Sequence, residues 1–374
     1  MEVMESIVWL EAGSEKLVQS VVQGHGRIGF MRLEANHGVF FKRIGEDIVI
    51  LAVHVDDCAV TGNSMTIIKE FMIAMNKKYK LTNTGLASWL LGIKITRDLT
   101  NRMLSLSQHA YIEAIITKYN FNDLKPLAIP INPSILLSKT QGPSKLEDIA
   151  RMKNVPYREA VGSLMYTAMG TRPDIALATS TVAQFCDNPG WVHWEAVKRI
   201  FRYLLGTKKL ELVYGGESRG IVGYVDADGA LQEHRRAISG YIFMVGGGAV
   251  SWSSKKQEFV TLSTTEAEYI TQTHAAKEAV WLCHLLTELF GPMEGPTTLF
   301  SDSKSAIALA QDSHYHARTK HIDIRYHFIR YIIEASTIKL VYCSTDNMTA
   351  DTLMKALPSI KAKHFASALG LSTV

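Results

Sequence analysis

Apolar positions repeat with two different periods along this chain, and the changes of period predict where strands and helices lie. From residue 28 onward, apolar residues fill two runs that are interrupted at residues 45–47, which predicts two β-strands joined by a turn. A helix is predicted at about 64–80, where apolar residues recur every three or four positions. A hairpin that turns at 98–101 and a helix over 108–119 complete this strand-rich part.

Residues 122–156 interrupt the regular pattern. Prolines recur among polar residues there, which is typical of a linker or an irregular connection. Helices are predicted next, at about 157–169, 173–186 and 191–205. The third has an apolar stripe at positions i, i+3, i+4 and i+7, which is typical of a helix that packs on a core.

The last part of the chain, from about residue 217, combines strands and helices. Three consecutive strands are predicted before a long helix at about 264–290. A strand, a short helix, a second helix, a strand and a final helix over TADTLMKAL follow. The long helix has a capping box, Ser263 with Glu266, at its start and Gly291-Pro292 at its end. By itself, this order predicts a mixed α/β domain.

Composition narrows the class of protein. A chain of 374 residues with 47% hydrophobic content can bury more than one core, so two or three domains are expected. The net charge of +4 permits a nucleic-acid partner without requiring one. Four scattered cysteines argue against a disulfide framework, and no apolar run reaches the roughly 20 residues that cross a bilayer. We expect a soluble intracellular protein, cytoplasmic or nuclear, with no membrane partner.

Four acidic residues stand where strands are predicted to end or helices to begin: Asp226, Glu268, Asp302 and Asp351. A single carboxylate at such a place is more often a helix cap or a solvated charge than a catalyst. Four that converge would repel one another, and a bound cation relieves that repulsion. Oxygen ligands without cysteine suit Mg²⁺ or a similar hard ion such as Mn²⁺. The pattern therefore predicts a metal site.

Two neighbouring acidic residues compete for these roles. Glu266 is assigned to the cap of the long helix, and Asp228 to a turn after the first strand of this part.

Several motifs identify a family. The chain resembles copia-type LTR retrotransposon polyproteins in YREAVGSLMYTAMGTRPDIA, HWEAVKRIFRYLLGT, SGYIFMVGGGAVSWSSKKQEFVTLSTTEAEY and RTKHIDIRYHFIR. The stretch HVDDCAVTG resembles the end of the reverse transcriptase in these polyproteins. The resemblance implies a partial reverse transcriptase palm and thumb start over 28–120 and a helical thumb or tether over 121–216. It implies a ribonuclease H-like domain over 217–374, with a mixed five-stranded sheet and helices, and leaves 1–27 unmatched.

The resemblance also implies a function. It carries Asp226, Glu268, Asp302 and Asp351 onto the family's metal-binding quartet, which holds two ions for hydrolysis of the RNA strand of RNA–DNA hybrids. Cellular ribonucleases H often have a histidine before the last aspartate, and the stretch VYCSTDNMTAD has none. The alternative is a non-catalytic, nucleic-acid-binding remnant of a transposable element. The remainder of a retrotransposon polyprotein is a further expected partner.

The polymerase part is expected to be inactive. Asp56 and Asp57 resemble the polymerase metal turn, with His54 where tyrosine is commoner. The chain has one aspartate upstream, Asp47, and its predicted place in a hairpin turn does not suit the third metal ligand. Without its upstream strands, the apolar run VILAVHV at 49–55 is expected to be unpaired on one side.

Two basic segments are candidates for contact with nucleic acid. In the segment from His314 to Arg330 the candidates are Arg318, Lys320, His321 and Arg325. Near 200 they are Lys198, Arg199 and Arg202, which lie off the apolar stripe. A solvated charged face is the alternative for both segments, and a zinc site at His321 and His327 is a further alternative for the first.

Overall fold

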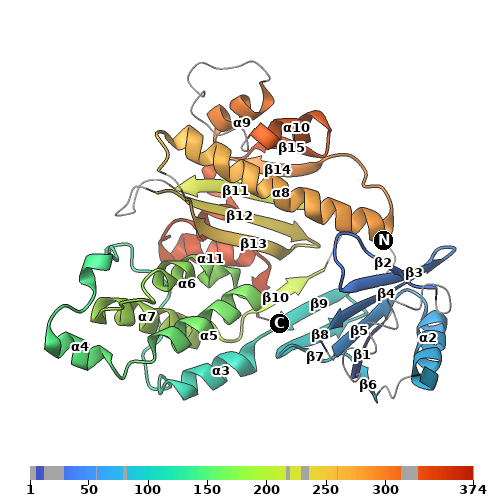
Figure 1. Cartoon of the computed structure of the whole chain (residues 1–374), viewed down its shortest axis with the longest axis horizontal. Coiled ribbons are helices and arrows are strands. Elements are labelled where there is room, and N and C mark those ends of the chain that lie inside the picture. Colours follow the sequence, from blue (N-terminus) through green and yellow to red (C-terminus); the bar gives the residue numbers. More distant parts are fainter. Residues whose placement is uncertain are drawn as a thin grey trace. The chain divides into compact units, whose positions relative to one another are not determined.

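The computed structural model describes residues 6–11, 29–55, 57–78, 82–215, 220–228, 236–258, 260–312 and 327–373 (Figure 1). The chain forms two compact units. The first contains residues 1–91, 95–102 and 281–294, and the second contains 92–94, 103–280 and 295–374. Within the described ranges, no helix has the length and apolar character needed to cross a membrane.

The first unit is built on a six-stranded sheet that is antiparallel throughout. Its strands, in spatial order, are β2 (Met31–Arg32), β3 (Val39–Ile44), β4 (Asp47–His54), β5 (Asp57–Gly62), β1 (Ser6–Glu11) and β6 (Thr82–Leu86). The helix α2 (Met65–Lys78) packs on this sheet, as its apolar period predicted, and Ile68 and Phe71 enter a core with Val49 and Leu51. The strands β7 (Trp89–Leu90) and β8 (Ile93–Asp98) follow along the chain.

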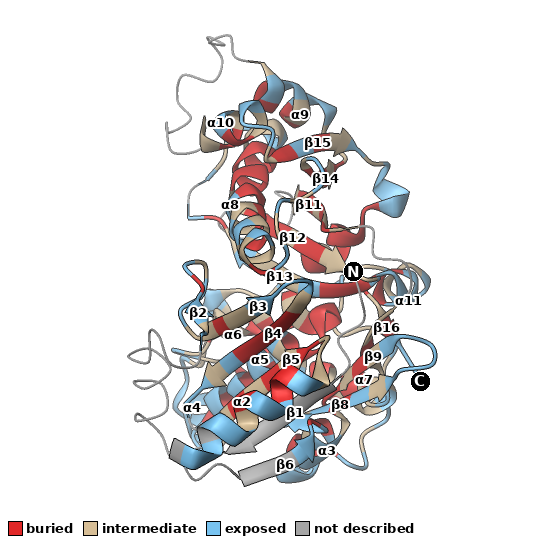
Figure 2. Cartoon of the chain, turned by 90° about the vertical axis from the view of Figure 1, so that its right-hand side faces the viewer, coloured by how far each residue is buried: buried red, intermediate tan, exposed pale blue. Residues whose placement is uncertain are grey.

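The expected unpaired edge in this unit was wrong. The strand β4 contains most of the apolar run 49–55, and it pairs with β3 on one side and with β5 on the other. In Figure 2 the middle of β4 is among the buried parts of this unit. The next strand along the chain returns beside β4 and satisfies its backbone groups, and β1 covers the far side of β5. The apolar strand is therefore central, where a continuous hydrophobic run is expected.

The second unit begins with a strand and a helical region. Its elements are β9 (Met103–Ser107), α3 (His109–Lys118), the 3₁₀ turn η1 (Lys139–Gln141), α4 (Leu146–Met152), α5 (Tyr157–Gly170), η2 (Pro173–Ile175), α6 (Ala176–Ala183), α7 (Trp191–Thr207) and β10 (Glu211–Tyr214). The predicted helices at 108–119, 157–169 and 191–205 are confirmed to within two residues, and the one at 173–186 is a 3₁₀ turn followed by α6. The aromatic rings of Phe121, Trp194 and Phe201 lie in one buried cluster between these helices.

The mixed five-stranded sheet expected from the resemblance to ribonuclease H is confirmed. Its spatial order is β13-β12-β11-β14-β15, with β14 and β15 parallel to β11 and the other neighbours antiparallel. The strands are β11 (Val222–Asp228), β12 (Ile238–Val245), β13 (Gly248–Lys256), β14 (Thr297–Ser301) and β15 (Ile338–Tyr342). The helices are α8 (Thr264–Phe290), α9 (Lys304–Gln311), α10 (Phe328–Glu334) and α11 (Ser359–Ala368), and β16 (Leu371–Ser372) pairs with β10.

The long helix α8 begins and ends where its capping signals predicted. Ser263 Oγ accepts a hydrogen bond from Glu266 N at 3.2 Å, and Glu266 Oε2 accepts one from Leu262 N at 2.7 Å. At the other end Gly291 has φ +89°, a conformation that glycine adopts without strain, and its N–H donates to Thr287 O. The start of α8 lies across the sheet (Figure 1), where Thr271 Oγ1 is 2.7 Å from Ser239 Oγ of β12.

The final helix was predicted in the wrong place. Residues of the motif TADTLMKAL form a 3₁₀ turn, η6 (Thr349–Leu353), and the α-helix α11 starts only at Ser359. Pro358 precedes α11, and the residue before a proline is disfavoured in helical conformation. The helical path is therefore broken between Asp351 and α11.

Candidate metal centre

Three of the four predicted carboxylates come together at one edge of the mixed sheet. Asp226 lies near the end of β11, Asp302 follows β14 directly, and Glu268 lies in the second turn of α8. Each offers one oxygen, and the three oxygens lie within 4.8 Å of one another. The register explains the meeting of two of them, because β11 and β14 are parallel neighbours in which Val225 is opposite Ser301. The next residue along the chain is an aspartate in both cases, Asp226 within β11 and Asp302 directly after β14.

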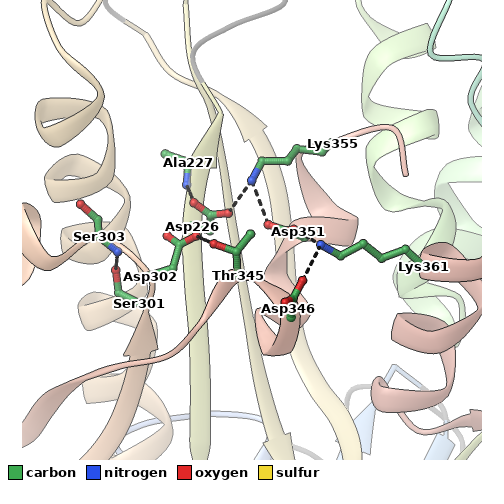
Figure 3. Close-up of polar contacts among 10 residues, drawn as sticks. All are labelled: Asp226, Ala227, Ser301, Asp302, Ser303, Thr345, Asp346, Asp351, Lys355 and Lys361. Atoms are coloured by element: carbon green, nitrogen blue, oxygen red, sulfur yellow. Dashed lines mark hydrogen bonds and ion pairs between the residues drawn. The ribbon is translucent and has the colours of Figure 1, made fainter. Parts of the chain in front are cut away.

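Two of these carboxylates are buried, and they differ in their hydrogen-bond partners. Asp226 is 2% exposed and Glu268 is 6% exposed. Asp226 Oδ1 accepts a hydrogen bond from Ala227 N at 2.8 Å (Figure 3), whereas Glu268 Oε2 has no hydrogen-bond partner within the described part of the chain. Burial raises the pKa of both carboxyls, and the adjacent Glu268 raises the pKa of Asp226 further. An arrangement of buried acidic oxygens with one left unpaired fits a hard divalent cation.

Asp302 is held by groups that the sequence analysis did not identify. Thr345 Oγ1 donates to Asp302 Oδ2 at 2.9 Å (Figure 3). Asp302 is less buried than Asp226 and Glu268. Ser301 Oγ accepts hydrogen bonds from Ser303 N at 3.3 Å and from Gln272 Nε2 at 3.0 Å. These contacts fix the backbone on both sides of Asp302. One sequence signal could have identified this support: Gln272 lies one helical turn after Glu268 on α8, so the two side chains are on the same face of the helix.

The fourth predicted carboxylate, Asp351, is adjacent to the cluster but engaged elsewhere. It is 1% exposed and lies in η6. Lys355 Nζ is 3.0 Å from Asp351 Oδ1 and 3.2 Å from Asp226 Oδ2, so one ammonium bridges the two aspartates (Figure 3). Burial alone would lower the pKa of Lys355, but the two carboxylates, Asp226 first, raise it above its usual range. Sequence reasoning missed Lys355.

The two competing acidic residues lie outside the cluster, as expected. Glu266 caps α8, as described above. Asp228 was predicted to lie in a turn, but it is the last residue of β11 and is opposite Ile238 of β12. It lines a cavity of about 560 Å³ between that strand and the helical region of the second unit.

The basic residues near position 200 have distinct surroundings. Lys198 Nζ is 2.8 Å from Glu195 Oε1 and lies over the ring of Trp191. Arg199 and Arg202 line the cavity just described, and Arg202 Nε donates to a backbone carbonyl at 2.7 Å. Their contact with nucleic acid stays a prediction.

Several predicted residues lie outside the described part of the chain. They are Asp56 of the polymerase turn and the basic residues Arg318, Lys320, His321 and Arg325. Asp57 begins β5, opposite His54 on β4 and Glu11 on β1. His327 Nδ1 lies 2.8 Å from the Tyr269 hydroxyl, so one of its ring nitrogens already has a partner.

Comparison with known proteins identifies the family. Residues 12–133 match the family model described as reverse transcriptase (RNA-dependent DNA polymerase), a match that begins within the stretch 1–27 that sequence reasoning left unmatched. The crystal structure of LC11-RNase H1 in complex with RNA/DNA hybrid is 16% identical, with a TM-score of 0.28, and the alignment covers 36% of this chain and 94% of that one.

Three curated relatives share longer stretches. The Retrovirus-related Pol polyprotein from transposon TNT 1-94 of Nicotiana tabacum is 42% identical over 91% of this chain and 26% of its own length. The corresponding polyprotein from transposon RE1 of Arabidopsis thaliana is 36% identical over 93% of this chain and 23% of its own length. This chain thus spans about a quarter of these two polyproteins. The putative transposon Ty5-1 protein YCL074W of Saccharomyces cerevisiae is 32% identical over 67% of this chain and 80% of its own length. The chain therefore belongs to the copia-type retrotransposon Pol polyprotein family and contains a reverse transcriptase region.

Proposed function

We propose that residues 217–374 form a ribonuclease H that hydrolyses the RNA strand of RNA–DNA hybrids with Mg²⁺ or Mn²⁺. The observation that carries the proposal is the convergence of Asp226, Glu268 and Asp302 within 4.8 Å, with Glu268 Oε2 buried and unpaired. Buried carboxylates without such a role are normally paired with a cation or a hydrogen-bond donor. Membership of a Pol polyprotein family supplies the substrate class.

The residues of the chain have separable tasks in this function. Asp226, Glu268 and Asp302 would hold an ion, and Asp351 would contribute to a second. When bound at such a centre, divalent ions lower the pKa of a water molecule and stabilise the charge that develops on the leaving oxygen. Thr345 and Ser301 keep Asp302 in place through the hydrogen bonds described above. Preorganisation of this kind matters because the ligands need not move during the reaction.

Recognition of the hybrid is assigned to basic residues of the helical region and of the segment before α10. Phosphate contacts from lysine and arginine would give affinity that falls as salt is raised. Selection of the RNA strand would depend on contacts with 2′-hydroxyl groups in the wide minor groove. We propose Arg318, Lys320, His321 and Arg325, together with Lys198, Arg199 and Arg202, for the phosphate contacts.

We propose further that the reverse transcriptase region does not polymerise DNA. The aspartate upstream of the Asp56-Asp57 pair is Asp47, and it lies at the β3–β4 hairpin, paired with Ile44. It therefore begins β4, at the opposite end of that strand from His54, which is paired with Asp57. Primer extension by the purified chain on an RNA template, in Mg²⁺ and in Mn²⁺, should give no product. Extension above the level of a denatured sample would contradict this proposal.

A second candidate function is nucleic-acid binding without cleavage. One observation favours it: Asp351 forms ion pairs with Lys355 and Lys361 and lies outside the group of three carboxylates. The stretch 338–350, which precedes Asp351, also has no histidine that could protonate the leaving group.

Cleavage of a labelled RNA–DNA hybrid by the full chain in Mg²⁺ distinguishes the two candidates. The Asp302→Asn variant should lose cleavage while keeping its melting temperature. Asp346→Asn is the matched control, because it removes a carboxylate that is exposed and lies nearby, and it should cleave normally. If the folded parent bound the hybrid in a salt-dependent manner and did not cleave it, the second candidate would be correct.

A further inference from the structure

A lysine ammonium lies between two buried carboxylates of the metal centre. Lys355 Nζ contacts Asp226 Oδ2 at 3.2 Å and Asp351 Oδ1 at 3.0 Å. The side chains of both aspartates are 2% exposed, whereas that of Lys355 is 33% exposed. The aspartates are held by the backbone of β11 and η6, but the lysine stem reaches solvent. Lys355 is therefore the one member of this trio that can move away without unfolding its surroundings.

The four carboxylates form two groups that share Asp226. The first group is Asp226, Glu268 and Asp302. In it Lys355 contacts Asp226, and Glu268 Oε2 has no hydrogen-bond partner among the described residues. The second group is Asp226 and Asp351, whose facing oxygens already share the ammonium of Lys355. A centre for two ions needs two cation positions that share a ligand. In this chain one of those positions is filled by a side chain.

We propose that Lys355 is a built-in counter-ion that makes the two cation positions unequal. One divalent ion binds at Asp226, Glu268 and Asp302 while Lys355 stays in place. A second ion, at Asp226 and Asp351, binds only in competition with the Lys355 ammonium. This inference rests on the proposed assignment of the carboxylates as metal ligands.

The charges give the physical reason for the inequality. The first ion faces three carboxylates, and of these only Asp226 also contacts the Lys355 ammonium, so attraction dominates. The second ion would have to lie a few ångströms from an ammonium in a site shielded from water, where repulsion between like charges is strong. Two divalent ions neutralise the four carboxylates without any help from the lysine. Lys355 is therefore expected to swing towards solvent when the second ion binds.

Lys361 provides a matched comparison within the same site. Its Nζ is 3.7 Å from Asp351 Oδ2 and 3.8 Å from Asp346 Oδ1, and its side chain is also 33% exposed. It carries the same charge as Lys355, and both lysines contact Asp351. The second contact differs, because Lys361 pairs with the exposed Asp346 whereas Lys355 pairs with the buried Asp226. If position between the two buried aspartates is what matters, Lys355 and Lys361 should differ in effect.

The test is calorimetric titration of the full chain with Mn²⁺, without nucleic acid, at fixed pH and ionic strength. The parent should bind one ion with a Kd at least about tenfold lower than that of a second ion. In Lys355→Met the second ion should bind about tenfold more tightly than in the parent, and the melting temperature in EDTA should fall. Lys355→Arg retains the charge, so the second ion should remain weak.

Two further variants define the position of each ion. Lys361→Met should leave the second Kd within about twofold of the parent value, because this lysine is not between the two buried aspartates. Asp351→Asn should abolish the second ion and retain the first. If Lys355→Met does not fold in EDTA, the comparison of Lys355→Arg with Asp351→Asn still tests the assignment.

Equal affinity for two ions in the parent would overturn the inference. So would an unchanged second Kd in folded Lys355→Met, or an equal effect from Lys361→Met. These outcomes are independent of hybrid cleavage, which is measured separately. Unequal ion binding that shifts in Lys355→Met, in a parent that does not cleave, would contradict the proposed function and support the role of Lys355.

Discussion

Arg172 and Asp174 form an ion pair inside the second unit, with no part of the arginine exposed. Arg172 Nε is 2.9 Å from Asp174 Oδ1, and Arg172 Nη2 is 2.6 Å from Asp174 Oδ2. The Tyr203 hydroxyl donates to Asp174 Oδ2 at 2.7 Å, and Thr207 of the same helix accepts from the guanidinium. The pair thus joins the η2 turn to α7. Its charges are compensated only while all of these partners are present.

The first prediction concerns this pair. Asp174→Asn should lower the free energy of unfolding by about 3–5 kcal/mol, because it leaves the Arg172 charge buried without a counter-ion. Urea denaturation followed by circular dichroism measures the effect. Asp187→Asn is the control, since Asp187 is fully exposed in its pair with Arg158, and it should cause no measurable change. Equal stability of Asp174→Asn and the parent would show that the pair does not stabilise α7.

The second prediction concerns pH. Burial raises the pKa of Asp226 and Glu268 in the folded protein. An unfolded carboxyl titrates near about pH 4. Between that pH and the raised pKa, the folded state binds more protons than the unfolded state. In EDTA these groups should therefore make the protein less stable as pH rises through this window. Glu268→Gln should be more stable than the parent at pH 8 by on the order of 2 kcal/mol, with the difference vanishing near pH 4.

Thermal melts of parent and Glu268→Gln across this pH range, with and without Mn²⁺, measure the effect. Comparing the two proteins at each pH removes the contribution of other titrating groups, such as the buried His193. Mn²⁺ should raise the melting temperature of the parent more than that of the variant. A parent that is more stable than Glu268→Gln at pH 8 in EDTA would contradict the assigned electrostatics.

The third prediction concerns a glycine in the strand that positions Asp226. A Cβ at Gly223 would lie 2.7 Å from Leu299 Cδ1 and 2.7 Å from Phe243 Cε1, both in the sheet core. Gly223→Ala should therefore cost about 1–3 kcal/mol of unfolding free energy through overpacking. Gly162→Ala is the control, because nothing lies within 4 Å of its added Cβ in α5. The control should be stabilised by about 0.5–1 kcal/mol, and chemical denaturation of both variants checks the contrast.

The fourth prediction concerns the support of Asp302. Ser301→Ala removes the hydroxyl that accepts from Ser303 N and from Gln272 Nε2, so the loop that carries Asp302 should be less well placed. Mn²⁺ affinity, measured by calorimetry, should fall about tenfold. Ser305→Ala removes an exposed hydroxyl on the neighbouring helix and should leave the affinity unchanged. Unaltered Mn²⁺ binding in Ser301→Ala would mean that Asp302 is positioned without this network.

Local patterns were sufficient for most of the secondary structure. The start of α8 at Ser263 and its end at Gly291 depend on side chains within a few residues, and these signals were correctly interpreted. The prediction of the final helix was wrong because the helical pattern continues through Lys355, whereas Pro358 disfavours helical conformation in the residue before it. The strand β4 was recognised as a strand, but its two partners were not, since pairing depends on how remote segments meet.

The candidate metal centre also has features that local sequence patterns indicate and features that depend on the tertiary structure. The sequence by itself placed Asp226 and Asp302 at strand ends and Glu268 near a helix start, because those positions follow from short-range periodicity and from motifs of the family. Asp351 lies in a 3₁₀ turn and not at the predicted start of an α-helix. Only the tertiary structure decided that Asp226, Glu268 and Asp302 converge while Asp351 is shared with Lys355. The bridge from Lys355 to Asp226 joins residues that are 129 positions apart. Such a contact is created by the packing of η6 beside β11 and β12, and no local pattern in the chain encodes it.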